Sequence, residues 1–266
     1  MKKKETASGK PAASRDGNRR PDELRPVKIR LDVFEFAHGS ASIEIGRTKV
    51  AAAATVEERV PPFLKGRGKG WVTAEYAMLP CATESRTPRE RGPGRISGRS
   101  MEIQRLLGRA LRTAVDLSAI GERQIIVDCD VLQADGGTRT ASVTVGCIAL
   151  ALALKKMMDA RLIDRMPLRH LVAGISVGLV DGQPFLDLDY EEDFRAGLDM
   201  NVIETDDGQL VEVQAGAEKM PFSRKELAGL LKLADKGIAR LVQAQKNALK
   251  KKSLMFMAYG RRKERG

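Results

Sequence analysis

The spacing of apolar residues in the first half of the chain predicts five β-strands. The expected strands cover Val27 to Phe34, Ala41 to Ile45, Val50 to Val56, Val72 to Leu79 and Gln124 to Leu132. The third run is almost continuously apolar, which indicates a strand that is buried on both faces.

Apolar positions that recur every three or four residues predict three helices. The first opens at Ser100 and reaches Val115, and the second, which is much more apolar, runs from Thr138 to about Ala160. The third follows Ser223, which is expected to form a capping box with Glu226. Helices therefore alternate with groups of strands along the chain.

Strand signals return in the second half of the chain. The expected strands are Val172 to Val180, Phe185 to Leu188, Met200 to Glu204 and Leu210 to Gln214. The first pair is joined by a turn at Asp181 to Gln183, and the second pair forms a hairpin across Asp206 to Gly208. The fold class is therefore mixed α/β (α+β), a single domain of two βα halves, although no sequence repeat relates the halves.

The composition is that of a globular protein. The chain has 266 residues, 42% hydrophobic and 30% charged, enough for one domain or two small ones with a real core. Its most apolar helix is interrupted by Lys155 and Lys156, short of the roughly 20 apolar residues of a membrane span. No hydrophobic segment follows the N-terminal lysines, so we expect no secretory signal, no membrane contact and a cytoplasmic location.

Basic residues are concentrated at the two ends of the chain. Residues 1–20 carry a net charge of +5 and residues 246–266 carry +7, which leaves −1 of the total +11 for the body. We expect a disordered basic tail over 1–20, a folded domain over 21–249 and a second basic tail over 250–266. Such tails either bind polyanions or aid solubility, and composition does not separate these two roles.

Cysteine and histidine usage excludes several kinds of site. Cys81, Cys129 and Cys147 are odd in number and widely spaced, so neither a disulfide framework nor a zinc site is expected. Cys129 and Cys147 lie in apolar patterns typical of small buried residues. His38 and His170 belong to no nucleophile motif, which argues against Cys/His and Ser/His/Asp catalysis, and both are interpreted as structural.

A glycine pair separates the strand ending near Leu132 from the apolar helix that follows. Gly136 and Gly137 permit a sharp turn and a close approach of an anion to the amides that open the helix. Thr138 and Arg139 add a hydroxyl group and a guanidinium group, which match phosphate oxygens. Taken alone, the segment is better explained as a tight connection before a capped helix with a solvated Arg139. No GK[ST] follows the glycines, which argues against a P-loop NTPase.

Arg99 is placed where a cation is unfavourable. It lies at the N-terminal end of the predicted helix from Ser100, where the helix dipole repels positive charge. The stretch from Lys65 to Arg109 contains ten basic and four acidic residues and is the positive patch of the body. Both facts suggest that Arg99 binds an anion at this helix N-terminus.

The segment from Asp187 to Met200 holds six carboxylates in fourteen residues. Such a run is either a solvated loop or a set of oxygen ligands for a divalent cation, of which magnesium keeps several waters. Together with Arg99 and the GGTR turn, this run would give a protein phosphate-binding cations beside metal-binding anions. That combination is typical of phosphoryl transfer.

These motifs resemble those of one known family. The segments WVTAEYAMLP, RTPRE, SGRSMEIQRLLGRALR, VDCDVLQADGGTRTAS, DLDYEED, LDMNV and PFSRKEL are similar, in this order, to RNase PH, a phosphate-dependent 3′ to 5′ exoribonuclease that trims tRNA and other RNA ends. The resemblance extends from about Arg20 to Leu249 and leaves only the tails outside.

The resemblance implies roles for individual residues. Residues expected to hold the attacking phosphate are Arg99, Gly137, Thr138 and Arg139. Asp193 and Asp199 match the catalytic carboxylate pair that binds magnesium, and Arg86 and Arg89 match arginines that contact RNA.

The resemblance also implies partners and shows departures. Family members form a hexameric ring, a trimer of dimers, and act on RNA such as tRNA precursors, so a homo-oligomer and an RNA partner are expected. Cys81 stands where arginine is common in the family, and VQAGAE replaces VQGTAE. A catalytically inactive RNA-binding ring subunit of the same fold is the alternative function, but it should have lost part of the phosphate and carboxylate set.

Overall fold

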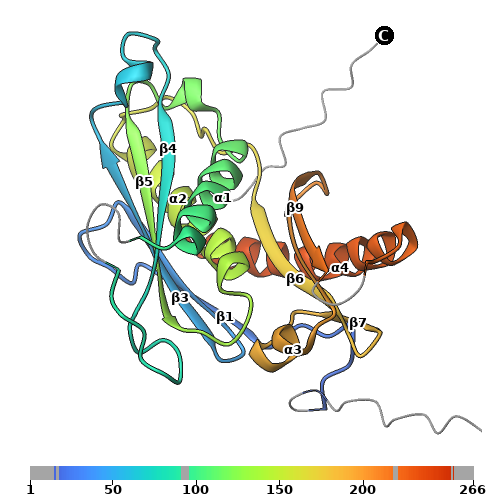
Figure 1. The fold of residues 1–266 in the computed structure, drawn as a ribbon. Coiled ribbons are helices and arrows are strands. Elements are labelled where there is room, and N and C mark those ends of the chain that lie inside the picture. The colour runs from blue at the N-terminus through green and yellow to red at the C-terminus, as the bar shows by residue number, and fades with distance from the viewer. Residues whose placement is uncertain (1–14, 16–17, 91–95, 218–220, 253, 255–266) are drawn as a thin grey trace, which may run out of the picture.

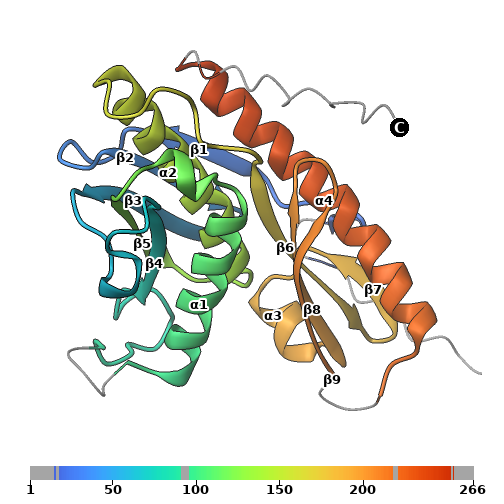
Figure 2. The same cartoon turned by 90° about the horizontal axis from the view of Figure 1, so that it is seen from above.

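Two β-sheets face each other across a pair of helices, and a third long helix covers the far side of the second sheet (Figures 1 and 2). This computed structural model describes residues 15, 18–90, 96–217, 221–252 and 254. The layers follow the order sheet, helices, sheet, helix, because each apolar face is covered by the next element.

The first sheet contains five strands in the order β1-β2-β3-β5-β4. The strands are β1 (Val27–Leu31), β2 (Gly39–Ile45), β3 (Thr48–Glu57), β4 (Trp71–Met78) and β5 (Gln124–Gln133). All neighbours pair antiparallel except β4 and β5, which run parallel and are joined through helix α1 (Gly98–Thr113). Short 3-10 turns lie at Pro62–Leu64 and Leu117–Ala119.

The second sheet contains four antiparallel strands in the order β7-β6-β8-β9. The elements of this half are β6 (Val172–Val180), β7 (Gln183–Leu186), α3 (Tyr190–Arg195), β8 (Leu198–Thr205), β9 (Leu210–Ala217) and α4 (Arg224–Lys250). Helix α4 begins at the expected capping box, in which the Ser223 side chain accepts a hydrogen bond from the Glu226 amide and Glu226 bonds back.

Helix α2 (Thr138–Asp159) lies at the centre of the fold between the two sheets. It is long and apolar enough to span a membrane, but 83% of its apolar window is buried inside the protein. Small residues let the elements approach closely: a Cβ on Gly39 of β2 would lie 2.3 Å from the Ala149 carbonyl oxygen. The helix is therefore the main core element of this fold.

The mixed α/β class, the order of the elements and the three long helices are confirmed, with small shifts at their ends. The first strand ends at Leu31 rather than Phe34, because Asp32 takes a left-handed conformation (φ 55°) and turns the chain. The first helix begins at Gly98, not Ser100, because Ser97 caps it by accepting a hydrogen bond from the Ser100 amide.

The proposed boundary of the N-terminal tail is wrong for its last residues. Arg15 and Arg19, expected in a disordered tail, have side chains that are only 2% and 7% exposed and pair with Glu192. Most of residues 1–20 and the end of the C-terminal tail lie outside the described residues, so the proposed tails are not tested there. Lys250, assigned to the second tail, is the last residue of α4.

Candidate active site

The predicted glycine turn connects β5 to the N-terminus of α2. Gly136 and Gly137 have φ of 72° and 65°, a conformation that favours glycine. A Cβ on Gly136 would lie 2.4 Å from the Leu188 carbonyl oxygen, so the turn and the acidic segment after β7 pack backbone against backbone. Gly137 is the N-cap and provides no side-chain cap, which leaves the first amides of α2 without a side-chain acceptor.

The Thr138 side chain is held in a fixed orientation. Tyr76 of β4 donates a hydrogen bond through Oη to Thr138 Oγ1 over 3.0 Å. Because the Thr138 oxygen acts as acceptor in this contact, the hydroxyl proton remains available to a ligand. Burial raises the pKa of Tyr76, although the Thr138 hydrogen bond and the charges of Arg99 and Arg139 oppose this shift, so Tyr76 stays protonated as the donor.

Two arginines approach this turn from different helices. Arg99 lies in the first turn of α1, and Arg139 lies in the first turn of α2. Arg139 Nη1 donates to Gln214 Oε1 on β9 over 3.0 Å and lies 3.3 Å from Glu102 Oε1. These contacts orient the guanidinium group of Arg139, whose side chain is 17% exposed.

The acidic segment after β7 forms a short helix rather than a loop. Asp189 caps α3 by accepting a hydrogen bond from the Glu192 amide, and Glu192 bonds back to the Asp189 amide. Asp193 therefore lies in a helix, while Asp199 lies on β8. The six carboxylates consequently divide into structural residues, such as Glu192, and residues that face the cavity described next.

Two glycines flank Asp199 in the second sheet. In the register of the second sheet, Asp199 is paired with Gly178 on β6 and with Gly216 on β9. A Cβ on Gly216 would lie 3.5 Å from Asp199 Oδ1, and one on Gly178 would lie 2.6 Å from the Leu198 carbonyl oxygen. Neither glycine carries a side chain, and at Gly178 the Leu198 carbonyl group and the Leu188 side chain already fill the place that a Cβ would take.

The two candidate carboxylates interact electrostatically. Partial burial of its carboxyl group and the negative charge of Asp199 raise the pKa of Asp193. The positive charges of Arg99 and Arg139 act in the opposite direction. The charges of Asp199, Arg99 and Arg139 therefore all affect the pKa of Asp193.

One cavity of about 580 Å³ brings these groups together. It is lined by Arg99, Gly137, Thr138, Arg139, Ser176, Asp193, Phe194, Ala196, Asp199 and Asn201. All six residues predicted to bind phosphate or to act as the carboxylate pair thus line the same cavity. Because they come from both halves of the fold, the cavity exists only when the two sheets are assembled.

The sequence did not reveal four further residues of this cavity, which are Ser176, Phe194, Ala196 and Asn201. Ser176 and Asn201 face each other on β6 and β8, and Ser176 Oγ also accepts a hydrogen bond from the Leu188 amide over 3.1 Å. Asn201 follows Asp199 with the period of two that places both on one face of a strand, a signal that was available in the sequence. Phe194 is 76% exposed beside Asp193, as an aromatic group at the edge of the cavity.

The residues expected to contact RNA are not in the cavity. Arg86 and Arg89 are exposed in the irregular segment between β4 and α1, part of which lies outside the described residues. The charge of Arg89 acts on Asp130 of β5, where it opposes the rise that burial causes in the pKa of Asp130. Cys81, where the family commonly has arginine, is also exposed.

Three N-terminal arginines contact the acidic segment, and one of them, Arg25, also contacts the glycine turn. Arg25 pairs with Asp187 and donates to the carbonyl groups of Asp135 and, at 3.5 Å, Gly136. Arg15 binds Glu192 through Nε at 2.6 Å and through Nη2 at 2.8 Å, and Arg19 adds a contact of 3.0 Å to the same carboxylate. The N-terminal segment therefore ties together the two walls of the cavity.

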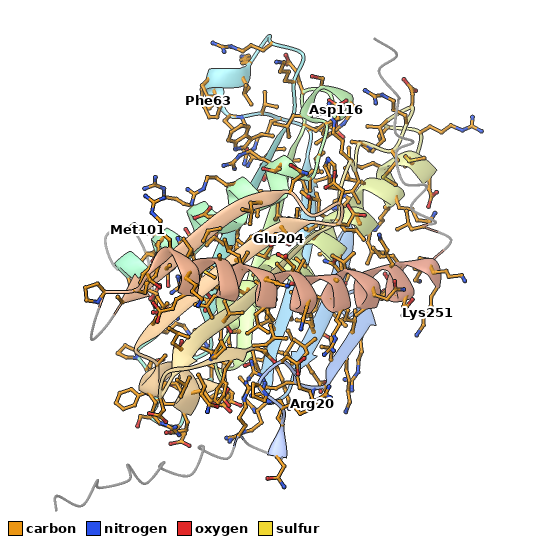
Figure 3. All side chains as sticks on the ribbon, turned by 90° about the vertical axis from the view of Figure 1, so that its right-hand side faces the viewer. Arg20, Phe63, Met101, Asp116, Glu204 and Lys251 are labelled. Carbon is orange, nitrogen blue, oxygen red and sulfur yellow. The ribbon has the colours of Figure 1, made fainter. Side chains whose placement is uncertain are left out.

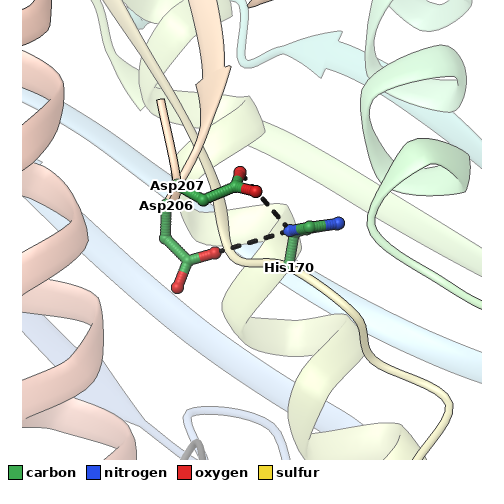
Figure 4. A group of neighbouring side chains, drawn as sticks. All are labelled: His170, Asp206 and Asp207. Atoms are coloured by element: carbon green, nitrogen blue, oxygen red, sulfur yellow. Dashed lines mark ion pairs between the residues drawn. The ribbon is translucent and has the colours of Figure 1, made fainter. Parts of the chain in front are cut away.

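The histidines have local partners. His38 Nδ1 accepts a hydrogen bond from the Val56 amide over 3.2 Å. His170 lies near two carboxylates, with Nδ1 3.8 Å from Asp206 and 3.6 Å from Asp207 (Figure 4). This group could hold a cation, although Asp206 already pairs with Lys246 over 3.1 Å. Neither histidine lies in the cavity.

The fold and this site can be compared with known proteins. Residues 23–156 match domain 1 of the 3′ exoribonuclease family, and residues 170–237 match its domain 2. The structure of rice (Oryza sativa) Rrp46 is similar, with a TM-score of 0.71, 20% sequence identity, and coverage of 88% of this chain and 99% of that chain.

Two archaeal structures are also similar to this chain in fold. The Archaeoglobus fulgidus exosome with RNA bound to the active site has a TM-score of 0.74 and 23% identity, covering 87% of this chain and 92% of that one. An archaeal exosome core has a TM-score of 0.70 and 22% identity, covering 88% and 91%. Identities this low establish a shared fold, while the two family domains cover most of the chain in order. The protein therefore belongs to the RNase PH family of 3′ exoribonucleases.

Proposed function

We propose that this protein is an active phosphorolytic 3′ to 5′ exoribonuclease, the activity of RNase PH itself. The observation that carries the proposal is the composition of the cavity. It combines two arginines and the open N-terminus of α2 with a pair of carboxylates. An anion site beside an acidic pair fits a reaction in which inorganic phosphate attacks a phosphodiester.

The anion site supports phosphate as the attacking group. The cavity lining includes Arg99, Gly137, Thr138 and Arg139, which carry guanidinium groups, a hydroxyl group and main-chain amides that can bind an anion. Phosphate is already an anionic nucleophile at neutral pH, so the main obstacle is its repulsion from the RNA phosphate. Positive charge in a low-dielectric cavity offsets that repulsion and fixes the orientation of the nucleophile.

The carboxylate pair fits a magnesium ion. Asp193 and Asp199 offer hard oxygen ligands. Burial and then the charge of Asp199 raise the pKa of Asp193, and a divalent cation would relieve the repulsion between the two carboxylates. The cavity of about 580 Å³ that Asp193 and Asp199 line offers room for the water molecules that magnesium retains. When bound, magnesium would neutralise charge on the scissile phosphate and the leaving oxygen.

The proposed reaction transfers the terminal nucleotide of the RNA to inorganic phosphate. A phosphate oxygen forms a bond to the phosphorus of the terminal phosphodiester, and the bond from that phosphorus to the 3′ oxygen of the preceding nucleotide breaks. The products are a nucleoside 5′-diphosphate and an RNA shorter by one nucleotide. Arg99 and Arg139 bind and align the phosphate, so the chain needs no separate base to activate water.

The RNA is proposed to reach the cavity past exposed groups. Phe194 can stack on a base at the cavity edge, and Arg86 and Arg89 are proposed to contact the phosphate backbone. The archaeal exosome with RNA in its active site, which has this fold, supports RNA as the substrate class. We propose tRNA precursor 3′ ends as the substrate, a cytoplasmic location, and a homohexameric ring built as a trimer of dimers.

Two other functions are distinguished by experiment. An inactive RNA-binding ring subunit should have lost part of the site, yet all six predicted cavity residues are present. A hydrolytic metal nuclease would use the acidic pair without the phosphate site. The test is to incubate protein, magnesium and an RNA labelled in its 3′-terminal nucleotide with and without phosphate, and to identify the product. Diphosphates that appear only with phosphate support the proposal, whereas monophosphates or an unchanged RNA contradict it.

A further inference from the structure

Helix α4 carries basic side chains on the face that points away from the second sheet. From Arg224 to Lys250 the helix contains seven basic and two acidic residues. Figure 3, in which α4 lies in front of the second sheet, shows this outer face and labels Lys251 at its C-terminal end. The opposite side of the helix is apolar and includes the buried residues Leu230 and Ile238. One face of α4 therefore packs into the core, and the other presents cations to solvent.

The cations of this outer face form a row along the helix. The basic row consists of Lys225, Lys232, Lys236, Arg240 and Lys250, all of which are exposed. The first four lie seven, four and four residues apart, a spacing that places them on one side of a helix. At 1.5 Å per residue, the row from Lys225 to Lys250 is about 38 Å long.

The basic row is poorly neutralised by the protein itself. In the part of the chain that the structure describes, the side chains of Lys225, Lys232, Arg240 and Lys250 form no ion pair or hydrogen bond. Lys236 Nζ lies 3.7 Å from Asp22 Oδ2, and a long contact between two exposed groups contributes little. Most charges of the row are therefore free to bind an external anion.

The two acidic residues of α4 already have partners of their own. Glu226 accepts hydrogen bonds from the amide and the hydroxyl group of Ser223 in the capping box. Asp235 shares a side-chain hydrogen bond with the buried Glu204 of β8. The outer face of α4 consequently keeps an excess of positive charge, which attracts a polyanion.

A groove of about 660 Å³ lies beside the N-terminal half of the basic row. It is lined by Lys225, Lys232 and Lys236, and also by apolar residues such as Leu179 and Pro184 from the hairpin of β6 and β7. None of the described residues that line it is aromatic or carries an amide side chain, the groups that stack on bases or read their edges. The groove therefore suits a sugar–phosphate backbone better than a recognised base.

We propose that the basic row of α4 is a second RNA-binding surface, which binds the phosphate backbone away from the 3′ end without reading its sequence. A straight row of this length matches an extended polyanion, which can contact all of its members at once. The cavity of the proposed active site, about 580 Å³, encloses only the end of an RNA chain and shares no lining residue with the groove. The inference rests on the proposed function only for the choice of RNA as the polyanion.

The test measures RNA binding in the full-length Asp193→Asn/Asp199→Asn protein, so that it needs no turnover and is separate from the phosphorolysis assay. Lys225, Lys232 and Lys236 are replaced together by glutamine, which removes charge and keeps helix propensity. For an RNA of about 30 nucleotides, affinity should fall at least about tenfold, and the slope of log affinity against log salt by about two, or about 0.7 per lost contact. Affinity for an RNA of about five nucleotides, which occupies only the proposed active site, should not change.

The matched control removes three exposed charges that already have acidic partners, in the variant Arg59→Gln/Arg109→Gln/Arg165→Gln. Its slope should change by less than about one. Equal losses in the two variants would overturn the proposal, because overall charge would then explain the binding. An unchanged affinity of the α4 variant for the long RNA would also overturn it, and weaker binding of that variant to anionic phospholipid vesicles would then assign the row to a membrane surface.

Discussion

Arg25 and Asp187 lie 162 positions apart and form a two-pronged ion pair, with Nη2 2.7 Å from Oδ1 and Nε 2.9 Å from Oδ2. Their side chains are 7% and 2% exposed. The same guanidinium group donates to the carbonyl groups of Asp135 and Leu188, which belong to opposite walls of the proposed active site. Arg25 is therefore a positioning residue, which sets the distance between the glycine turn at Gly136 and the acidic segment after β7.

We expect Arg25→Lys to impair turnover although it keeps the charge. A lysine cannot reproduce contacts to Asp187, Asp135 and Leu188 together, and a misplacement of about 1 Å costs on the order of a hundredfold in rate. Steady-state kinetics should show a higher KM for phosphate and a lower kcat. Arg30→Lys, at an exposed pair with Glu44, is the control and should behave as wild type. Equal kinetics for the two variants would show that Arg25 has a purely structural role.

Arg139→Lys should reduce kcat/KM for phosphate by about tenfold or more, because a point charge replaces a planar group that Gln214 orients. Titration of phosphate at saturating RNA measures this effect. Arg109→Lys, which alters an exposed pair with Glu212 outside the cavity, serves for comparison. Normal turnover of Arg139→Lys at limiting phosphate would remove Arg139 from the phosphate site.

Asp193→Asn and Asp199→Asn should each lower kcat by at least about a hundredfold, since several kcal/mol of stabilisation by the cation is lost. RNA binding should persist in both variants, because removal of a negative charge does not weaken attraction to a polyanion. Magnesium titrations of activity and of RNA affinity separate the two effects. Glu191 is exposed on α3, the helix that contains Asp193, and the Glu191→Gln variant should remain active. If both aspartate variants cleave normally, the acidic pair is not catalytic.

The ion pair between Arg15 and Glu192 should make the free energy of unfolding depend on pH in the acid range. Burial by itself would raise the pKa of Glu192, but the hydrogen bond and charge of Arg15, with the charge of Arg19, outweigh it and lower the pKa. The folded state therefore binds the proton less readily than the unfolded chain. The stabilisation is complete above the ordinary value of 4.5 and is lost as pH falls through the lowered pKa.

Urea unfolding over a pH series tests this dependence. Glu192→Gln should lower the free energy of unfolding by about 3 kcal/mol at neutral pH, because it leaves Arg15 buried without its partner. Between neutral and acid pH, the free energy of unfolding of Glu192→Gln should change less than that of wild type. The control Glu191→Gln, on the same helix, should keep the wild-type pH profile. Parallel profiles for wild type and Glu192→Gln would assign the acid dependence to other groups.

Phe194→Ala should raise KM for RNA by about tenfold and leave KM for phosphate unchanged, since stacking of one base contributes about 1–3 kcal/mol. Phe194→Tyr should restore most of the affinity. Phe36→Ala provides the control, because Phe36 is 95% exposed and outside the cavity. A KM for RNA that is insensitive to Phe194→Ala would exclude it from the path of the RNA.

Local signals account for what the sequence predicted. The turn at Gly136, the capping box at Ser223 and the period of α1 depend on neighbouring residues, and all three are present in the structure. Phosphate and carboxylate residues were assigned through a resemblance, and the cavity brings them together, although their chemical roles stay predictions.

Long-range contacts account for what the sequence did not predict. Arg15 lies in a stretch with almost nothing apolar, and its burial depends on Glu192, 177 positions away. The glycines beside Asp199 are likewise adjacent only through strand register. Tertiary pairing of this kind leaves no periodic trace in the sequence, so composition indicated a free tail and unremarkable glycines.

The glycines around the proposed active site also limit which substitutions the cavity tolerates. At Gly136 a methyl group would lie 2.4 Å from the Leu188 carbonyl oxygen, and at Gly178 it would lie 2.6 Å from that of Leu198. A single alanine at either position would displace one wall of the cavity while every arginine and aspartate remained in the sequence. The shape of this cavity therefore depends on residues that carry no charge and no side chain, as well as on its arginines and aspartates.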